Sequence, residues 1–162
     1  MINPLILLHA MVAEFGLFAF LWVLVEVLNP TEARIRRARI AASLGLACLL
    51  VAWFAGGFYY VEVYGSHVKP AIKASDVAWV HSVVMEVKEH VFLFLPVLAA
   101  TTVALLIKYN NELLHNRDAR VSVAMLAGLV FLLGFAIAGM GVIIAGGYRF
   151  AMEAGLASIP KH

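Results

Sequence analysis

The sequence is poor in cysteine and in charge. Its 162 residues contain one cysteine, Cys48, which excludes an internal disulfide and any metal motif built from several cysteines. Charged side chains make up 14% of the chain, whereas about 25% is usual for a soluble domain. The net charge of +2 is small and scattered, so no nucleic acid partner is expected. No phosphate-binding loop or nucleophile motif is present, so independent catalysis is not expected.

Long hydrophobic runs dominate the chain, which is 64% hydrophobic. About 20 apolar residues cross a bilayer core, and four runs are long enough, at about 4–28, 40–61, 77–107 and 121–148. The first run follows no basic segment and precedes no cleavage site, so we expect it to be retained. Because lipid leaves no backbone group unpaired, each run should be a helix. The sequence predicts an all-α integral membrane four-helix bundle, with residues 1–162 as one transmembrane domain.

Basic residues predict how the bundle is oriented. The segment 29–39 between the first two runs contains four arginines, and the connection after the third run adds Lys108, Arg117 and Arg120. Positive residues favour the cytoplasmic side of a membrane. We therefore expect both termini and the segment 62–76 to face outward, from the inner (cytoplasmic) membrane of a bacterium or archaeon.

A histidine and a glutamate five residues apart occur in the first and the third run. These pairs are His9 with Glu14 and His81 with Glu86, at an offset of 72 residues. The letters AGG before an aromatic residue also end the second and the fourth run, at an offset of 90. The pattern predicts two duplicated two-helix halves related by an axis along the membrane normal. The alternative is chance similarity between apolar helices.

The two repeated histidines are the main candidates for cofactor binding. His9 and His81 each lie about five residues into parallel runs, so both should lie about 7 Å below the outer rim. Two imidazoles at one level, His9 and His81, fit the two axial positions of a haem iron. The alternative is that each imidazole only forms a hydrogen bond with a neighbour. Glu14 and Glu86 should lie one layer deeper.

The densest polar run inside any apolar stretch is MEVKEH, at residues 85–90. His90 lies nine residues after His81, on the opposite helical face, so it is a rival of His81 rather than its partner. This run is interpreted in three ways: it ligates a deeper cofactor, it relays protons, or it neutralises its own charges. The candidate proton carriers are Glu14, Glu86 and Glu89, because ionisable groups inside a membrane are often functional.

A dinuclear metal site is the alternative cofactor. Two histidines and two glutamates in adjacent layers resemble the ligands of carboxylate-bridged metals. However, the step from His9 to Glu14 is about 140° around the helix, which turns one side chain away from the other.

The expected outer segment adds further candidates. His67 is an alternative ligand if this segment folds inward. Arg149, Lys69 and Lys73 fall on the same side of the bundle, where cations pair with the propionates of a haem or with an acidic partner.

In general plan the chain resembles the small four-helix membrane b-type cytochromes, which hold haem between helices by histidine pairs. The resemblance implies haem b, electron transfer, and redox partners: other subunits, a periplasmic electron carrier or a quinone. Since the second and fourth runs contain no histidine, ligands come from the first and third runs or the outer segment. We expect a non-catalytic subunit or anchor of a larger redox complex, surrounded by membrane lipid. The alternatives are a proton or metal-cation transport component and a purely structural membrane subunit.

Overall fold

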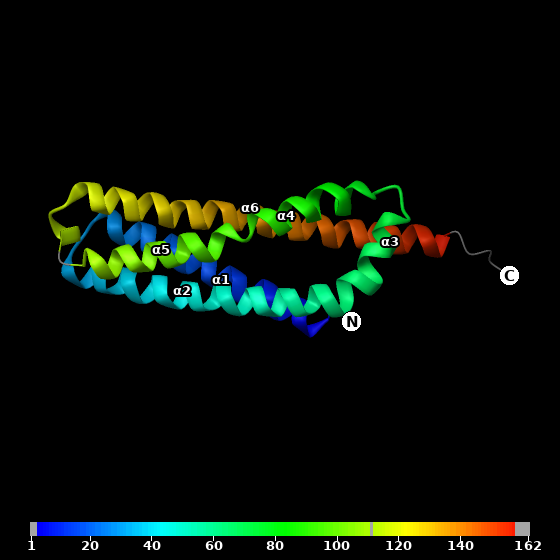
Figure 1. The fold of residues 1–162 in the computed structure, drawn as a ribbon, viewed down its shortest axis with the longest axis horizontal. Helices are drawn as coiled ribbons and strands as arrows, with labels where there is room; N and C mark the ends of the chain where they lie inside the picture. Colours follow the sequence, from blue (N-terminus) through cyan, green and yellow to red (C-terminus); the bar gives the residue numbers. More distant parts are fainter. Residues whose placement is uncertain (1–2, 111, 158–162) are drawn as a thin grey trace.

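The chain folds into an elongated bundle of long helices (Figure 1). The computed structural model describes residues 3–110 and 112–157, which contain helices and turns but no strand. Helices η1 and η2 are π-helical, and η3 is a short 3-10 helix. In chain order the helices are α1 (Pro4–Leu28), α2 (Glu32–Tyr59), η1 (Tyr60–Val68), α3 (Lys69–Lys73), η2 (Val80–Met85), α4 (Glu86–Val91), α5 (Phe94–Lys108), η3 (Glu112–Leu114) and α6 (Arg117–Ala157).

Four helical segments are long and apolar enough to cross a membrane. They are Pro4–Leu28, Glu32–Lys73, Val80–Lys108 and Arg117–Gly155. The all-helical fold and the four long apolar helices are therefore confirmed. The second and fourth segments are longer than expected, because helix continues through polar turns beyond the apolar runs. Most of the expected outer loop is accordingly helical, as η1 and α3.

Side-chain caps fix where the first two helices begin. The Asn3 side chain accepts a hydrogen bond from the backbone N–H of Leu5 at 2.9 Å, and Pro4 occupies the first helical position, where its missing N–H costs nothing. Thr31 caps α2 by accepting from the N–H of Arg34 at 3.2 Å. The connection between α1 and α2 is therefore short, and the arginines expected in a loop lie in the first turns of α2.

The helices pack as a four-cornered bundle. α1 packs along α2 and α6, and α5 also packs against α2 and α6, which places α1 and α5 on a diagonal. Beyond α5, the elements η2 and α4 pack against α6. The third long helix is interrupted between α4 and α5 because Pro96 has no N–H to bond the carbonyl of Phe92. Leu95 takes that carbonyl instead, with a shorter turn, at 3.1 Å.

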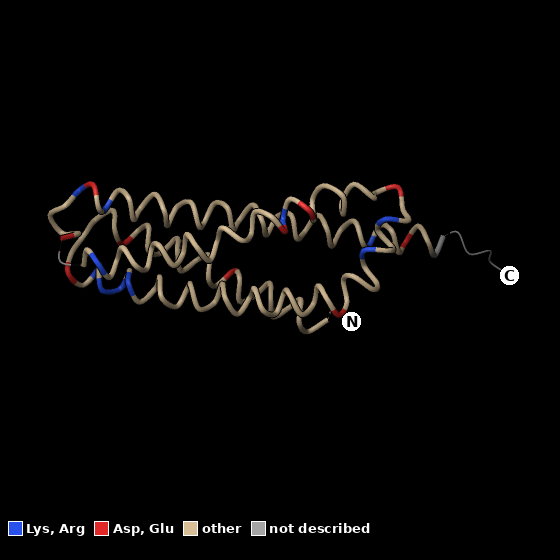
Figure 2. Tube along the Cα trace, in the orientation of Figure 1, with Lys and Arg blue, Asp and Glu red and all other residues tan. Residues whose placement is uncertain are grey.

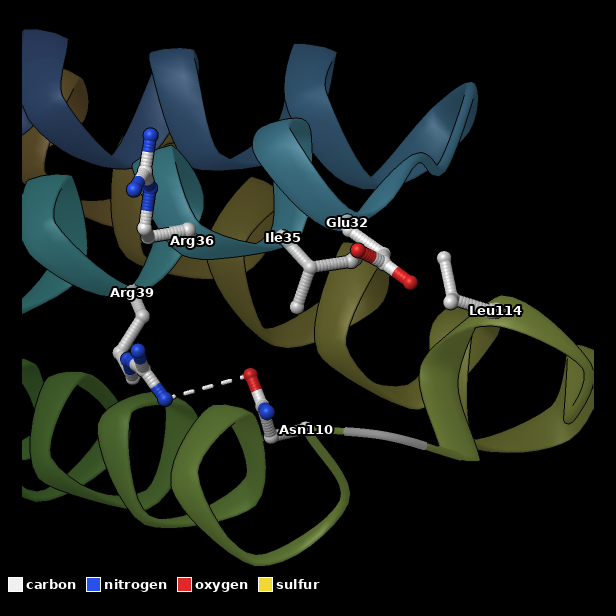
Figure 3. A pocket seen from close by; sticks show the side chains of 6 residues that line it. All are labelled: Glu32, Ile35, Arg36, Arg39, Asn110 and Leu114. Atoms are coloured by element: carbon white, nitrogen blue, oxygen red, sulfur yellow. Dashed lines mark hydrogen bonds between the residues drawn. The ribbon is translucent and has the colours of Figure 1, made fainter.

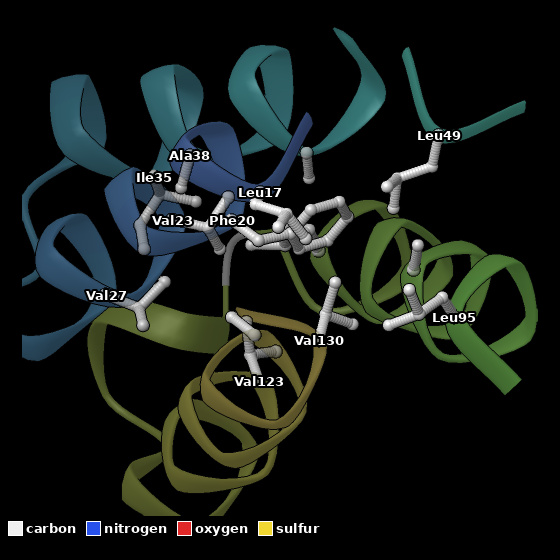
Figure 4. Close-up of a cluster of buried hydrophobic side chains, with 14 of the residues drawn as sticks. Leu17, Phe20, Val23, Val27, Ile35, Ala38, Leu49, Leu95, Val123 and Val130 are labelled. Atoms are coloured by element: carbon white, nitrogen blue, oxygen red, sulfur yellow. The ribbon is translucent and has the colours of Figure 1, made fainter. Parts of the chain in front are cut away.

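Two separate hydrophobic cores hold the bundle together. The larger one joins α1, α2, α5 and α6 around side chains such as Phe20, Val23 and Val130, which are fully buried (Figure 4). The smaller one joins η1, α3, η2 and α6 around Tyr64 and Ile72. The two cores lie toward opposite ends of the bundle.

Candidate functional site

A polar layer that includes Lys88 and Glu89 lies between the two cores, whereas His81 lies within the smaller core. Along α2 and η1 the stretch between the cores runs from Leu49 of the larger core to Tyr64 of the smaller one. On the third long helix it falls between Met85 and Leu95, and on α6 between residues 130 and 144. Charged residues gather at both ends of the bundle, with a smaller group part-way along (Figure 2).

His9 is held by α2. Its Nδ1 atom lies 2.7 Å from the carbonyl oxygen of Ala52. A carbonyl only accepts, so Nδ1 carries the proton and Nε2 keeps its lone pair. Gly56 makes the room for this contact, since a Cβ atom there would lie 2.6 Å from Nδ1. Among the described residues, Nε2 of His9 makes no hydrogen bond.

His81 is held by the smaller core. Its side chain is buried, and its Nδ1 atom lies 3.0 Å from the hydroxyl of Tyr64. The two rings also pack at an angle, with centroids 5.9 Å apart. Nε2 of His81 lies 3.8 Å from Oε1 of Glu86, which is an electrostatic contact rather than a hydrogen bond. His81 therefore resembles His9: its Nδ1 atom has a partner in the protein, and its Nε2 atom makes no hydrogen bond to a described residue.

The contacts along α6 give the relative depths of the two histidines. Gly134 faces Leu17 of α1, so His9, eight residues earlier, lies near residue 142 of the antiparallel α6. Gly147 faces Val80, which places the adjacent His81 near residue 146. His81 therefore lies about 6 Å closer than His9 to the end of the bundle that carries α3. The expectation that both imidazoles share one layer is wrong, because His81 is the second residue of a helix that begins at Val80, whereas His9 is the sixth residue of α1.

Lys88, rather than His81, shares the layer of His9. Its Nζ atom lies 3.8 Å from the position of a Cβ at Gly141, so the ammonium projects into the bundle toward α6. It interacts electrostatically with His9. The neighbouring Glu89 has a buried Oε1 atom that accepts no hydrogen bond in the part of the chain that the structure describes. Tyr60 lies beside this carboxylate.

The other candidates are exposed. His90 donates from Nδ1 to the carbonyl of Glu86 at 2.6 Å, and its side chain faces away from the bundle interior, as the helical spacing predicted. His67 lies 2.7 Å from the hydroxyl of Ser66 and is exposed on η1, so this segment does not fold it inward. The remaining exposed candidates are Glu14, Glu86 and Arg149.

Two lysines of α3 lie near His81. Lys69 and Lys73 both interact electrostatically with His81, because η1 and α3 carry them back over the end of the bundle. The sequence predicted that both lysines lie on the same side of the bundle as Arg149, but not that they lie near His81.

Glu26 is a buried charge that the sequence analysis overlooked. It is 5% exposed near the opposite end of the bundle and accepts a bidentate pair from Arg37, at 2.6 and 3.1 Å. Trp22 donates to the same carboxylate at 2.9 Å, and Arg34 lies 3.6 Å from it. The sequence does contain a signal for this pair. Glu26 lies in the last turn before an arginine-rich segment, so its carboxylate can pair with an arginine across a tight helical hairpin. This group joins α1 to α2 and lies far from the histidines.

No three histidine, cysteine, aspartate or glutamate side chains of the described segments come together where they could hold a metal ion. The dinuclear alternative thus finds no ligand set there, and haem ligation needs only two imidazoles. No protein-family model matches the chain, and no curated protein or solved structure is significantly similar to it. Function therefore has to be argued from the site itself.

Proposed function

We propose that this chain is a membrane-embedded electron-transfer protein that binds haem b, with His9 and His81 as the residues that would hold it. One observation carries the proposal: in both imidazoles Nδ1 is engaged by the protein while Nε2 makes no hydrogen bond to a described residue. Metal-ligating histidines have this arrangement, because a partner on one nitrogen fixes the ring and the tautomer for the other.

The residues around the two imidazoles fit such a group. Gly56 leaves room for the ring of His9, so that its Nδ1 atom can reach the carbonyl of Ala52 and its orientation is fixed. Lys69 and Lys73 near His81, and Lys88 near His9, supply positive charge for two propionates. Haem iron supplies one-electron redox chemistry when it is bound. The chain orients the two imidazoles and balances the acidic groups with nearby ammonium groups.

The proposed role requires a partner. Nearly all described residues belong to helices that are long and apolar enough to cross a membrane, so an electron donor or acceptor must come from elsewhere. We propose other redox subunits, a periplasmic electron carrier or a quinone, within the inner membrane of a bacterium or archaeon. Both termini then face outward, since the arginines of α2 belong on the cytoplasmic side.

The direct test is a reduced-minus-oxidised visible spectrum of the protein purified from haem-replete cells. We expect the bands of a low-spin haem b, which His9→Ala and His81→Ala should each remove or convert to a high-spin form. His67→Ala is the matched control, because this exposed histidine should leave the spectrum unchanged. A spectrum without haem bands contradicts the proposal. Loss of the signal in His90→Ala but not in His81→Ala would instead assign the ligand to the opposite helical face.

One observation favours proton transfer as a second function. The hydroxyl of Tyr64, the ring of His81 and the carboxylate of Glu86 follow one another at 3.0 and 3.8 Å, and Glu89 keeps an unpaired buried oxygen beside Tyr60. Groups of this kind in membrane proteins form proton relays. If haem is absent, proton flux into liposomes that is lost in Glu89→Gln and kept in Glu62→Gln, an exposed control, would establish this function. Equal flux in both variants would exclude it.

A further inference from the structure

The arginine-bearing end of the bundle contains a cavity of about 400 Å³. It lies where α2 begins and where the chain leaves α5, far from the proposed haem site. Figure 3 shows Arg39 and Asn110 meeting on one side and Glu32 near Leu114 on the other. The lining residues are Glu32, Ile35, Arg36, Arg39, Asn110 and Leu114.

The four arginines of α2 divide into two pairs. Arg34 and Arg37 are both engaged by the carboxylate of Glu26. Arg39 donates only to the neutral side-chain oxygen of Asn110, at 3.2 Å, and its charge meets no carboxylate among the described residues. Arg36 is exposed and makes no hydrogen bond or ion pair within the described segments. The pair without a counter-charge is the pair that lines the cavity.

The charge and shape of the lining select a ligand class. Once Arg36 turns toward Arg39, two arginines against one glutamate leave one net positive charge, which matches a singly charged phosphodiester. Guanidinium groups bind phosphate oxygens with paired hydrogen bonds. Arg39 is already positioned for this by Asn110, whereas Arg36 extends away from Asn110 and needs a rotamer change to join it (Figure 3). Glu32 can accept hydrogen bonds from headgroup hydroxyls.

The surface beside the cavity is suited to acyl chains. Ile40 and Leu44, in the next turns of α2, are 53% and 61% exposed, and Ile107 at the end of α5 is 58% exposed. A polar cavity at the end of membrane-length helices, followed by exposed apolar side chains, has the order of a headgroup and its tails. Basic pockets between helices on the cytoplasmic side are typical places for anionic lipid headgroups.

We propose that this cavity binds the phosphodiester of an anionic glycerophospholipid of the phosphatidylglycerol type, with Arg39 as the main contact. The proposal depends on the helices crossing a membrane but not on haem binding, so the two can fail separately.

The experiment uses the full chain in mixed micelles and counts retained lipid by native mass spectrometry. The probes are phosphatidylglycerol, phosphatidylethanolamine and phosphatidylcholine with identical acyl chains, and soluble glycerol 3-phosphate as a competitor. We expect retention of phosphatidylglycerol above both zwitterionic lipids, and little competition from glycerol 3-phosphate. Arg39→Gln should weaken this retention about tenfold, the usual effect of losing a charge-assisted hydrogen bond.

Arg117→Gln is the matched control, since Arg117 is exposed at the same end, at the start of α6, and does not line the cavity. It should retain phosphatidylglycerol like the unaltered chain. If Arg39→Gln does not fold, Arg36→Gln provides the same comparison with a smaller expected loss. Equal retention of the three lipids, equal losses in the cavity and control variants, or full displacement by glycerol 3-phosphate would each overturn the proposal.

Discussion

The contact between His9 and Gly56 gives the sharpest test of the proposed site. In Gly56→Ala the new methyl group would lie 2.6 Å from Nδ1 of His9 and 2.8 Å from Cε1. Carbon and nitrogen atoms pack best near about 3.5 Å, so the imidazole must move by about 0.9 Å or the helices must separate. Either change breaks the hydrogen bond from Nδ1 to Ala52.

The size of the effect follows from three contributions. Overpacking a tight contact costs about 1–3 kcal/mol, and the lost hydrogen bond about 1 kcal/mol more. Alanine is a better helix former than glycine by about 1 kcal/mol, which offsets part of this cost. We expect Gly56→Ala to lower the free energy of unfolding by about 1–3 kcal/mol. The adjacent Gly57 has no atom within 4 Å of its Cβ position, so Gly57→Ala should instead raise it by about 0.5–1 kcal/mol.

The assay compares the two variants in one detergent, by the midpoint of chemical unfolding and by the haem spectrum. Gly56→Ala should lose both stability and low-spin haem, because the displaced His9 no longer presents Nε2 in the same direction. Gly57→Ala should keep both. If the two variants bind haem equally, the position of His9 on Gly56 has no bearing on the cofactor and the proposed ligand role of His9 is refuted.

Two further predictions test the packing. A Cβ at Gly134 would overlap the buried side chain of Leu17, whereas a Cβ at Gly139 on the same helix meets nothing within 4 Å. Gly134→Ala should therefore unfold about 1–3 kcal/mol more easily than Gly139→Ala in a chemical unfolding series, and equal midpoints would show that α1 and α6 separate freely. Glu26→Gln should lower the midpoint of thermal unfolding by a few degrees, because an amide replaces one of the oxygens that Arg37 binds. An unchanged midpoint would mean that this pair does not stabilise the α1–α2 hairpin.

The helices could be predicted from the sequence, and α1 has the expected bounds, but the full lengths of the second and fourth helices could not. Hydrophobic length alone identifies segments that must bury their backbone groups, and this is why the four long helices were expected. The arginines of α2 and Tyr64 of η1 lie outside the apolar runs, yet they continue the helix because water or the smaller core accommodates their side chains. For this reason the second long helix begins at Glu32, before its apolar run, and ends at Lys73, after it.

The site was only partly predictable for a related reason. Its histidines stand out in the sequence because ionisable groups are rare in apolar helices. Their partners, Ala52 and Tyr64, are ordinary residues whose roles depend on how α2 is placed against α1 and on how η1 bends toward η2. The depth of His81 depends on the same bend. No spacing rule along one helix contains this information.

The contrast between two glutamates bears on the purely structural alternative. Polar groups that only lock helices together should have all their partners, and Glu26 meets this condition, with both carboxylate oxygens bonded by Arg37. Glu89, in the polar layer, has a buried oxygen with no hydrogen-bond donor among the described residues. Leaving a buried acceptor unpaired is costly. Glu26 therefore has the pairing of a group that joins two helices, whereas the unbonded oxygen of Glu89 supports the proposed binding or relay role over a purely structural one.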